Sequence, residues 1–226
     1  MNKIILKLPG ASDFFTQEAY KTLRTNLQFC GKAVRVVAVT SCHETEGKTS
    51  ISLNLGKSLA ELGKRVLVVD ADMRKSVMAG RHTNVKNPVG LSEVLTGMAQ
   101  LVDGLYATQL ETLDILFAGQ YPPNPVELLN SVYFSELIEQ LRVMYDYVIV
   151  DTPPLGRVID AAVIAPVCDG TLIVMADNAV RFRQATEVVE QLKKSGSKIL
   201  GVVRNDVRVR AESRYAYRKK YYAAEN

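Results

Sequence analysis

The residues with the clearest chemical potential lie in the segment VVAVTSCHETEGKTS, residues 36–50. A Val-rich apolar run leads into a polar loop, after which Gly47, Lys48 and Thr49 open a helical pattern. Such a corner binds phosphate because backbone N–H groups and the positive end of the helix face the anion. A lysine then neutralises the outer oxygens, and a hydroxyl can ligate Mg²⁺. The usual spacing is G-x-x-x-x-G-K-[ST], and Cys42 replaces the first glycine, so an ordinary strand–loop–helix corner stays an alternative.

Three aspartates stand at the ends of two later apolar runs. VLVVDADMR places Asp70 and Asp72 at the end of one run, and YVIVDTPP places Asp151 at the end of the other. If both runs are parallel strands, their carboxyl ends lie at the sheet edge that also carries the phosphate loop. Mg²⁺ prefers oxygen ligands, usually one or two carboxylates together with phosphates. Aspartates also cap helices, but three of them beside Gly-Lys-Thr favour a Mg²⁺–nucleotide site.

Apolar runs and helical patterns alternate along the chain, and they predict the elements that position these residues. Runs typical of buried strands cover 34–40, 65–70, 113–119, 146–151, 170–176 and 198–204. Helical spacing covers 16–30, 47–62, 126–145, 159–167 and 181–194. This alternation predicts an α/β fold, a mainly parallel β-sheet flanked by helices on both faces. We expect the helix at 16–30 to lie outside the core, because it precedes the first of these strands.

Composition limits the class of protein. The chain has 226 residues, of which 47% are hydrophobic and 23% charged, so it can fill one large core and is neither disordered nor fibrous. Three cysteines are too few for a disulfide framework or a zinc ribbon. No run approaches the roughly 20 apolar residues of a membrane-spanning helix. We therefore expect a soluble, intracellular protein.

The positive charge is concentrated in the last part of the chain. Residues 204–226 contain seven Arg and Lys against three Asp and Glu, and they thus account for the whole net charge of +4. The same segment holds four of the ten tyrosines, Tyr215, Tyr217, Tyr221 and Tyr222. The pattern indicates a neutral globule with a basic, tyrosine-rich tail.

The aspartate-bearing runs and the Gly-Lys-Thr loop together resemble the nucleotide-binding motifs of bacterial tyrosine kinases. VLVVDADMR resembles the second, Asp-rich Walker motif (A′) of that family, and YVIVDTPP resembles its Walker B motif. These kinases are P-loop enzymes of the MinD/ParA-like branch, with a deviant Walker A motif, and they regulate capsule and exopolysaccharide synthesis. YPPNPVELL at 121–129 resembles their stretch before the helix leading to Walker B, and the tyrosine cluster resembles their autophosphorylation tail. The resemblance covers about residues 13–222.

A further motif and two departures belong to this resemblance. EAYKTLRTN is similar to the family's E-x-x-R-x-x-R oligomer-interface motif, with Glu18, Lys21 and Arg24 in register. Lys21 is a departure, because lysine does not reproduce a bidentate guanidinium contact. Glu44 and Thr45 stand where the family loop usually has Pro-Gly, so residues that prefer negative φ replace a flexible turn. We expect these departures to weaken ring assembly and ATP affinity.

The resemblance implies an autophosphorylating protein-tyrosine kinase that uses Mg-ATP, in which catalysis consists mostly of positioning and charge neutralisation. The expected catalytic residues are Lys48, Asp70, Asp72 and Asp151, and the expected Mg²⁺ ligands are Thr49, Asp72 and Asp151. The expected nucleotide-binding residues are Glu46, Gly47, Lys48, Thr49 and Ser50 through the loop, and Asn205 at the adenine. The expected phosphoacceptors are Tyr215, Tyr217, Tyr221 and Tyr222. Asp70 either receives the acceptor tyrosine's proton or serves as a second Mg²⁺ ligand.

The resemblance also implies an organisation and partners. It divides the chain into an N-terminal segment with the interface helix (1–30), a P-loop kinase domain (31–208) and the basic tail (209–226). It implies a homo-oligomer that phosphorylates the tail in trans, and a membrane adaptor of the polysaccharide co-polymerase type that recruits a cytoplasmic kinase to the inner face of the plasma membrane. No nucleic-acid partner is expected. We expect the basic tail to be attracted by Glu44, Glu46 and the aspartates.

Two other functions stay open at this point. A partition or site-selection ATPase of the same branch would switch its dimerisation with ATP, but such proteins usually carry a second lysine five residues before the P-loop lysine, where this chain has His43. A catalytically weakened nucleotide-binding scaffold is the other, and intact Lys48, Thr49 and the three aspartates argue against it. The tail itself is either a substrate or a solvated basic segment that clings to anionic membrane or nucleic acid.

Overall fold

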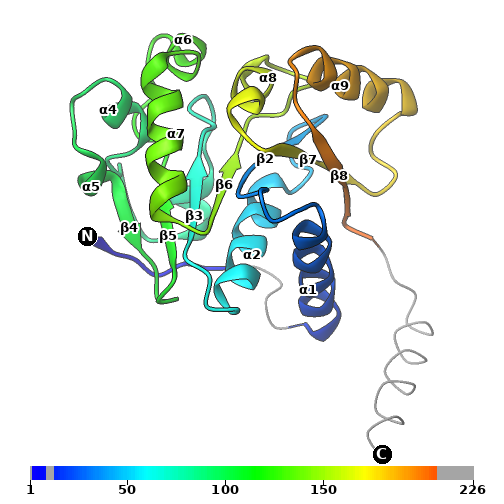
Figure 1. The fold of residues 1–226 in the computed structure, drawn as a ribbon, viewed down its shortest axis with the longest axis horizontal. Coiled ribbons are helices and arrows are strands. Elements are labelled where there is room, and N and C mark those ends of the chain that lie inside the picture. Colours follow the sequence, from blue (N-terminus) through cyan, green and yellow to red (C-terminus); the bar gives the residue numbers. More distant parts are fainter. Residues whose placement is uncertain (1, 9–12, 208–226) are drawn as a thin grey trace, which may run out of the picture.

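A sheet of eight strands runs through the part of the chain that the computed structural model describes, residues 2–8 and 13–207 (Figure 1). The strand order is β1-β4-β5-β3-β6-β2-β7-β8, and neighbours pair in parallel except for the antiparallel pair β4–β5. The strands are β1 (Asn2–Lys3), β2 (Val36–Ser41), β3 (Val66–Asp70), β4 (Leu105–Ala107), β5 (Leu113–Leu116), β6 (Tyr147–Asp151), β7 (Gly170–Ala176) and β8 (Ile199–Asn205). The predicted mainly parallel α/β sheet is confirmed, and β1 and β4 are additions that the apolar pattern did not predict.

Helices cover both faces of this sheet. They are α1 (Phe14–Phe29), α2 (Lys48–Ala60), α3 (Met78–His82), α4 (Leu91–Leu95), α5 (Leu101–Gly104), α6 (Pro125–Leu129), α7 (Val132–Met144), α8 (Asp160–Ile164), which runs into a 3₁₀ turn (Ala165–Val167), and α9 (Phe182–Lys194). In β2, Val37 and Val39 pack in the core with α2, whereas Val36 and Ala38 pack with α7 on the other face. Because side chains alternate along a strand, a strand covered on both faces is apolar throughout, as β2 is.

Two predicted helices differ from the structure. The helix predicted at 126–145 is divided into α6 and α7, because Ser131 caps the second: its Oγ accepts the N–H of Phe134 at 3.3 Å. The helix predicted at 16–30 does not lie outside the core. It is α1, which lies beside α2 in Figure 1 and buries Leu27 in the cluster under that helix.

The strand order creates a point where the connections diverge. From β2 the chain passes through α2 to β3, on one side of β2, whereas from β6 it passes through α8 to β7, on the other side. Ligands of parallel α/β sheets bind outside the carboxyl ends of the strands at such a point. The loops that follow β2, β3 and β6 meet there. No helix of the described residues is long and apolar enough to cross a membrane.

Candidate active site at the carboxyl edge of the sheet

The loop after β2 has the geometry of a phosphate cradle. Gly47, with φ +87°, caps α2, and Lys48 is the first residue of that helix. A Cβ at Gly47 would collide with Nδ2 of Asn205, at the end of β8. The Asn205 amide donates to the carbonyl of Glu46 at 2.9 Å. Glycine is thus required here by both the left-handed backbone and the close approach of β8.

The carboxylate of Glu46 is turned into the protein. It is 2% exposed, and it accepts the N–H of His43 at 2.6 Å and that of Ala176, the last residue of β7, at 3.3 Å. The side chain therefore ties the loop to the sheet, and it does not face the cavity that Lys48 lines. The expectation that Glu46 attracts the tail is wrong for this reason, since a buried carboxylate that accepts two backbone N–H groups offers little charge to a ligand.

Thr45 adopts a backbone conformation that is unfavourable for threonine. Its φ is +64°, in the left-handed region that disfavours β-branched residues. At this position, the loops of the kinase family that the sequence resembles usually carry glycine. The departure therefore stores strain in the exposed tip of the loop.

Replacing Thr45 with glycine is expected to stabilise the protein by about 0.5–1 kcal/mol, because relief of the left-handed strain exceeds the entropy that glycine adds to the unfolded chain. Urea unfolding of Thr45→Gly and of Thr45→Val measures the effect. The valine variant keeps the β-branch and the strain, so it serves as the control and is not expected to gain stability. A glycine variant less stable than the parent would contradict this account.

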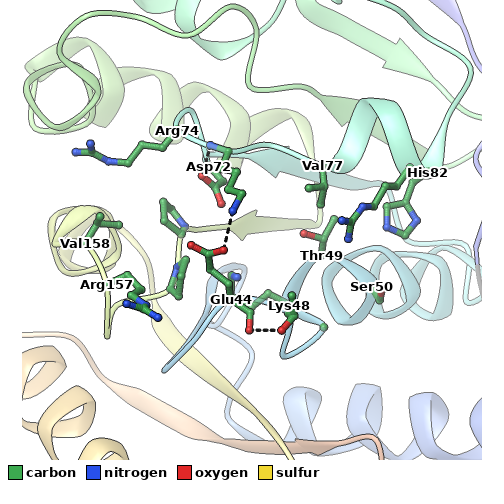
Figure 2. A pocket seen from close by; sticks show the side chains of 16 residues that line it. Glu44, Lys48, Thr49, Ser50, Asp72, Arg74, Val77, His82, Arg157 and Val158 are labelled. Carbon is green, nitrogen blue, oxygen red and sulfur yellow. Dashed lines mark hydrogen bonds and ion pairs between the residues drawn. The ribbon is translucent and has the colours of Figure 1, made fainter. Parts of the chain in front are cut away.

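A cavity of about 350 Å³ lies over the loop (Figure 2). The predicted residues Gly47, Lys48, Thr49, Ser50 and Asp72 line it together. Its other charged lining residues are Glu44, Arg74, Lys75, Arg81 and Arg157. Cations thus outnumber carboxylates around the opening, so this lining does not support the expected attraction of a basic tail by acidic side chains. The arrangement is suited to binding a polyanion.

Asp151 lies beneath the cavity, at the end of β6. It is 2% exposed; its Oδ2 accepts the hydroxyl of Thr49 at 2.6 Å, and its Oδ1 accepts the hydroxyl of Ser52 at 3.1 Å. Burial raises the pKa of Asp151 to about 6, against the lowering effects of the Thr49 hydrogen bond and the Lys48 charge. Ser52 was missed by the sequence reasoning, although its place three residues after Thr49 puts both hydroxyls on one face of α2.

Asp70 is the register partner of Asp151 on the neighbouring strand, and it is buried as well. Its Oδ2 accepts the hydroxyl of Ser76, and its Oδ1 accepts the N–H of Asp72 at 3.2 Å. Burial, and then the charge of Asp151, raises the pKa of Asp70 well above its ordinary value. Asp70 is not among the lining residues of the cavity, whereas Asp72 is. The structure therefore separates the two aspartates of the A′ run into one buried and one accessible carboxylate.

A second cavity of about 590 Å³ lies on the other side of the loop. Gly47 and Ser50 line it from the loop, Asn205 from the end of β8, and Phe15 and Tyr20 from α1. The predicted adenine residue Asn205 thus lies beside the phosphate loop and next to aromatic side chains. The sequence reasoning assigned no role here to α1, because a helix that precedes the first of the predicted strands gives no local sign of reaching the site.

The three predicted interface residues lie on α1. Lys21 and Glu18 form an ion pair at 2.7 Å within the helix. The guanidinium of Arg24 instead turns to α2, where Nη1 donates to the carbonyl of Ser58 at 2.6 Å. Arg24 thus fastens α1 to its own chain. Whether this face also meets a second copy stays a prediction.

Comparison with known proteins connects this geometry with families. The model of an AAA domain (AAA_31) matches residues 34–202. The chain is 41% identical to the tyrosine-protein kinase CpsD of Streptococcus agalactiae over 85% of this chain and 84% of that protein. It is 34% identical to a putative tyrosine-protein kinase in the cps region of Klebsiella pneumoniae, over 94% of this chain and 30% of that longer protein.

Solved structures distinguish a tyrosine kinase from a switch ATPase. The kinase domain of the Escherichia coli tyrosine kinase ETK has a TM-score of 0.78 and 30% identity, over 86% of this chain and 78% of that one. The septum site-determining protein MinD of Pyrococcus horikoshii, complexed with Mg-ADP, has a TM-score of 0.62 and 28% identity, over 75% of this chain and 69% of that one. Both likenesses bear out the P-loop fold, and the likeness to the switch ATPase is the weaker one.

Proposed function

This chain belongs to the bacterial tyrosine-protein kinases, and from this premise we propose how its site transfers phosphate from ATP to its tail. It is a protein-tyrosine kinase of capsule and exopolysaccharide synthesis. The observation that carries the proposal is the convergence of Lys48, Thr49 and Asp151 under a cavity with a cationic lining. Phosphoryl transfer needs this combination, since catalysis comes mainly from positioning and from neutralising charge.

Lys48 and the loop amides hold the phosphates in this proposal. The N–H groups of residues 46–50 and the start of α2 supply fixed positive dipoles. Lys48 supplies the charge that balances the outer phosphate oxygens, and it lines the cavity from the first position of the helix. The Asn205 side of the loop, with Phe15 and Tyr20, receives the adenine and the ribose.

The residues around Asp151 fit a magnesium ion. The hydroxyl of Thr49 and the carboxylate of Asp151 lie 2.6 Å apart, and Asp72 adds an accessible carboxylate, so the donors are oxygens of the kind that Mg²⁺ prefers. Thr49, Asp72 and Asp151 would hold the ion, which would neutralise charge on the phosphates. Ser52 positions Asp151 by donating to its second oxygen.

Asp70 keeps two proposed roles, as acceptor of the tyrosine's proton and as a second Mg²⁺ ligand. The raised pKa supports the uptake of a proton from a tyrosine. However, Ser76 and the N–H of Asp72 already donate to its oxygens, so a phenol reaches it only when one of these hydrogen bonds opens. A role as a second Mg²⁺ ligand requires the same opening.

The acceptors in this proposal are Tyr215, Tyr217, Tyr221 and Tyr222, which lie outside the described residues. A homo-oligomer presents the tail of one copy to the site of the next, with α1 at the interface. A membrane adaptor of the polysaccharide co-polymerase type recruits the kinase to the inner face of the plasma membrane. The likeness to the kinases named above supports both proposals.

Mixing two variants tests the transfer and its direction. One carries Lys48→Met and an intact tail, and the other carries Phe at the four tail tyrosines and an intact site. After incubation with Mg-ATP, with and without the activating adaptor segment, mass spectrometry of the tail is expected to find phosphate on the Lys48→Met copy. If neither copy carries phosphate while the parent phosphorylates its own tail, transfer in trans is contradicted. Hydrolysis of ATP by the parent without any phosphotyrosine would favour the switch ATPase.

A further inference from the structure

An ion pair crosses the opening of the phosphate cavity. Nζ of Lys75, in the segment after β3, lies 2.8 Å from Oε2 of Glu44, in the phosphate loop, and both residues line the cavity. Figure 2 shows the Glu44 side chain at one end of this dashed contact. The pair joins two segments that are 31 residues apart in the sequence.

The exposure of this pair indicates that it contributes little to stability. The side chains of Lys75 and Glu44 are 73% and 51% exposed. Exposed pairs of this kind contribute about 0–1 kcal/mol, so little free energy is lost when a ligand breaks the contact. The backbone of Lys75 is fixed, because its N–H donates to Oδ1 of Asp72 at 3.0 Å. Lys75 therefore has an anchored backbone and a long side chain that is free to change partner.

Glu44 lies among the cations of the cavity. The hydrogen bond and charge of Lys75 lower the pKa of Glu44 most, and the charges of Arg157 and Lys48 lower it further. Its carboxylate thus presents an anion to the groups that would face the outer phosphate of ATP. A terminal phosphate carries up to about two negative charges against one for the carboxylate, so it attracts a neighbouring ammonium more strongly.

We propose that Lys75 is a second phosphate-binding lysine, which leaves Glu44 and contacts the terminal phosphate when ATP enters the cavity. Glu44 then acts as an internal competitor that occupies Lys75 when ATP is absent. The inference rests on ATP binding at the proposed site and goes beyond it by assigning the sensing of the third phosphate to this pair. ADP, which lacks that phosphate, leaves the pair closed.

Arg74 and His43 do not combine these features. Nε of Arg74 donates to Oδ1 of Asp160 at 2.9 Å, and this carboxylate is buried, so Arg74 has a fixed partner away from the loop. Figure 2 shows the Arg74 side chain extending away from Lys48. His43 lines a separate cavity with Leu155 and Val188. Lys75 therefore stands as the lysine that links the loop's own carboxylate to the cavity.

Binding of Mg-ADP and of a non-hydrolysable Mg-ATP analogue, measured by calorimetry, tests the proposal. Lys75→Met is expected to lower the affinity for the analogue about tenfold and the affinity for ADP less than about twofold, because it removes one charged contact to the third phosphate. Glu44→Gln is expected to raise the affinity for the analogue several-fold and to leave the affinity for ADP nearly unchanged. This gain is expected to shrink when Lys75→Met is added, since the two residues act on each other. Lys64→Met is the matched control, because Lys64 is exposed and lies just before β3, at the end of the strand away from Lys75.

The outcomes separate this inference from the proposed function. The inference is overturned if Lys75→Met lowers the affinity for both nucleotides equally. It is also overturned if Glu44→Gln lowers the affinity for the analogue as Lys75→Met does, because the pair would then only shape the loop. In that case ATP binding by the parent still stands. If the parent binds neither nucleotide, the proposed function fails first and the inference fails with it.

Discussion

Lys48→Met is expected to lower the rate of tail phosphorylation by at least about a hundredfold. Methionine is an unbranched side chain only one heavy atom shorter than lysine, and it carries no charge. Lys48 opens α2, lines the cavity and is only 9% exposed, so its charge acts where solvent screening is weak. Loss of a single preorganised group at the site of developing charge costs about a hundredfold to a thousandfold in rate. The loss is expected in the rate and in ATP affinity together, because in the proposed mechanism Lys48 contacts the phosphates before and during transfer.

Initial rates of tyrosine phosphorylation, measured in the presence of the activating adaptor segment, check this expectation. Lys57→Met is the matched control, since Lys57 lies near the other end of α2 and pairs with Glu61 at the surface. Urea unfolding must show that both variants are folded. A Lys48→Met protein with more than a tenth of the parent's rate would show that the loop does not catalyse transfer in the proposed way.

Asp151→Asn is expected to have two opposite effects. The first is a loss of kinase activity of about a hundredfold or more, because the amide replaces a carboxylate that fits Mg²⁺ and accepts the Thr49 hydroxyl. The second is a gain in the stability of the nucleotide-free protein at neutral and alkaline pH. Asp151 is buried beside Asp70 and has a pKa raised to about 6, so its ionised form is unfavourable in the folded state.

The pH dependence follows from the direction of this shift. The ordinary pKa of an aspartate is about 3.9, so between about pH 4 and pH 6 the folded protein binds more protons at Asp151 than the unfolded chain does. The contribution of Asp151 to the free energy of unfolding therefore falls as the pH rises through this window and is at its lowest above it. The raised pKa of Asp70 acts in the same direction. At about pH 8, Asp151→Asn is expected to gain on the order of 2 kcal/mol, and at about pH 4 little.

Urea unfolding of the parent and of Asp151→Asn at about pH 4 and pH 8, without nucleotide, measures the second effect. Asp146→Asn is a control, because Asp146 lies at the opposite end of β6 in an exposed pair with Arg65. If Asp151→Asn is less stable than the parent at pH 8, its hydrogen bonds to Thr49 and Ser52 outweigh the buried charge, and the electrostatic account is wrong. Kinase assays on the same preparations report the first effect independently.

Local patterns in the sequence were sufficient for the framework of the site. The six predicted strands correspond to β2, β3, β5, β6, β7 and β8, because a strand covered on both faces must be apolar at successive positions. The motifs place Asp70 and Asp151 at the ends of two of these strands and Lys48 in the loop–helix corner after a third, and parallel pairing brings these ends to one edge. The division of α6 from α7 was missed, since the apolar stripe continues across the capping residue Ser131.

The sequence by itself determined the fold class, the nucleotide-binding loop and the kinase motifs, because these depend on residue order within short segments. The tertiary structure decided which way each side chain points. It turned Glu46 into the sheet and Glu44 toward Lys75, although the two glutamates are only two residues apart. It placed α1 beside the cavity that Asn205 lines on one side of the loop, and it buried Asp70 while leaving Asp72 accessible. These outcomes depend on contacts between segments distant in the chain, where burial and hydrogen bonding, rather than local pattern, set the lowest free energy.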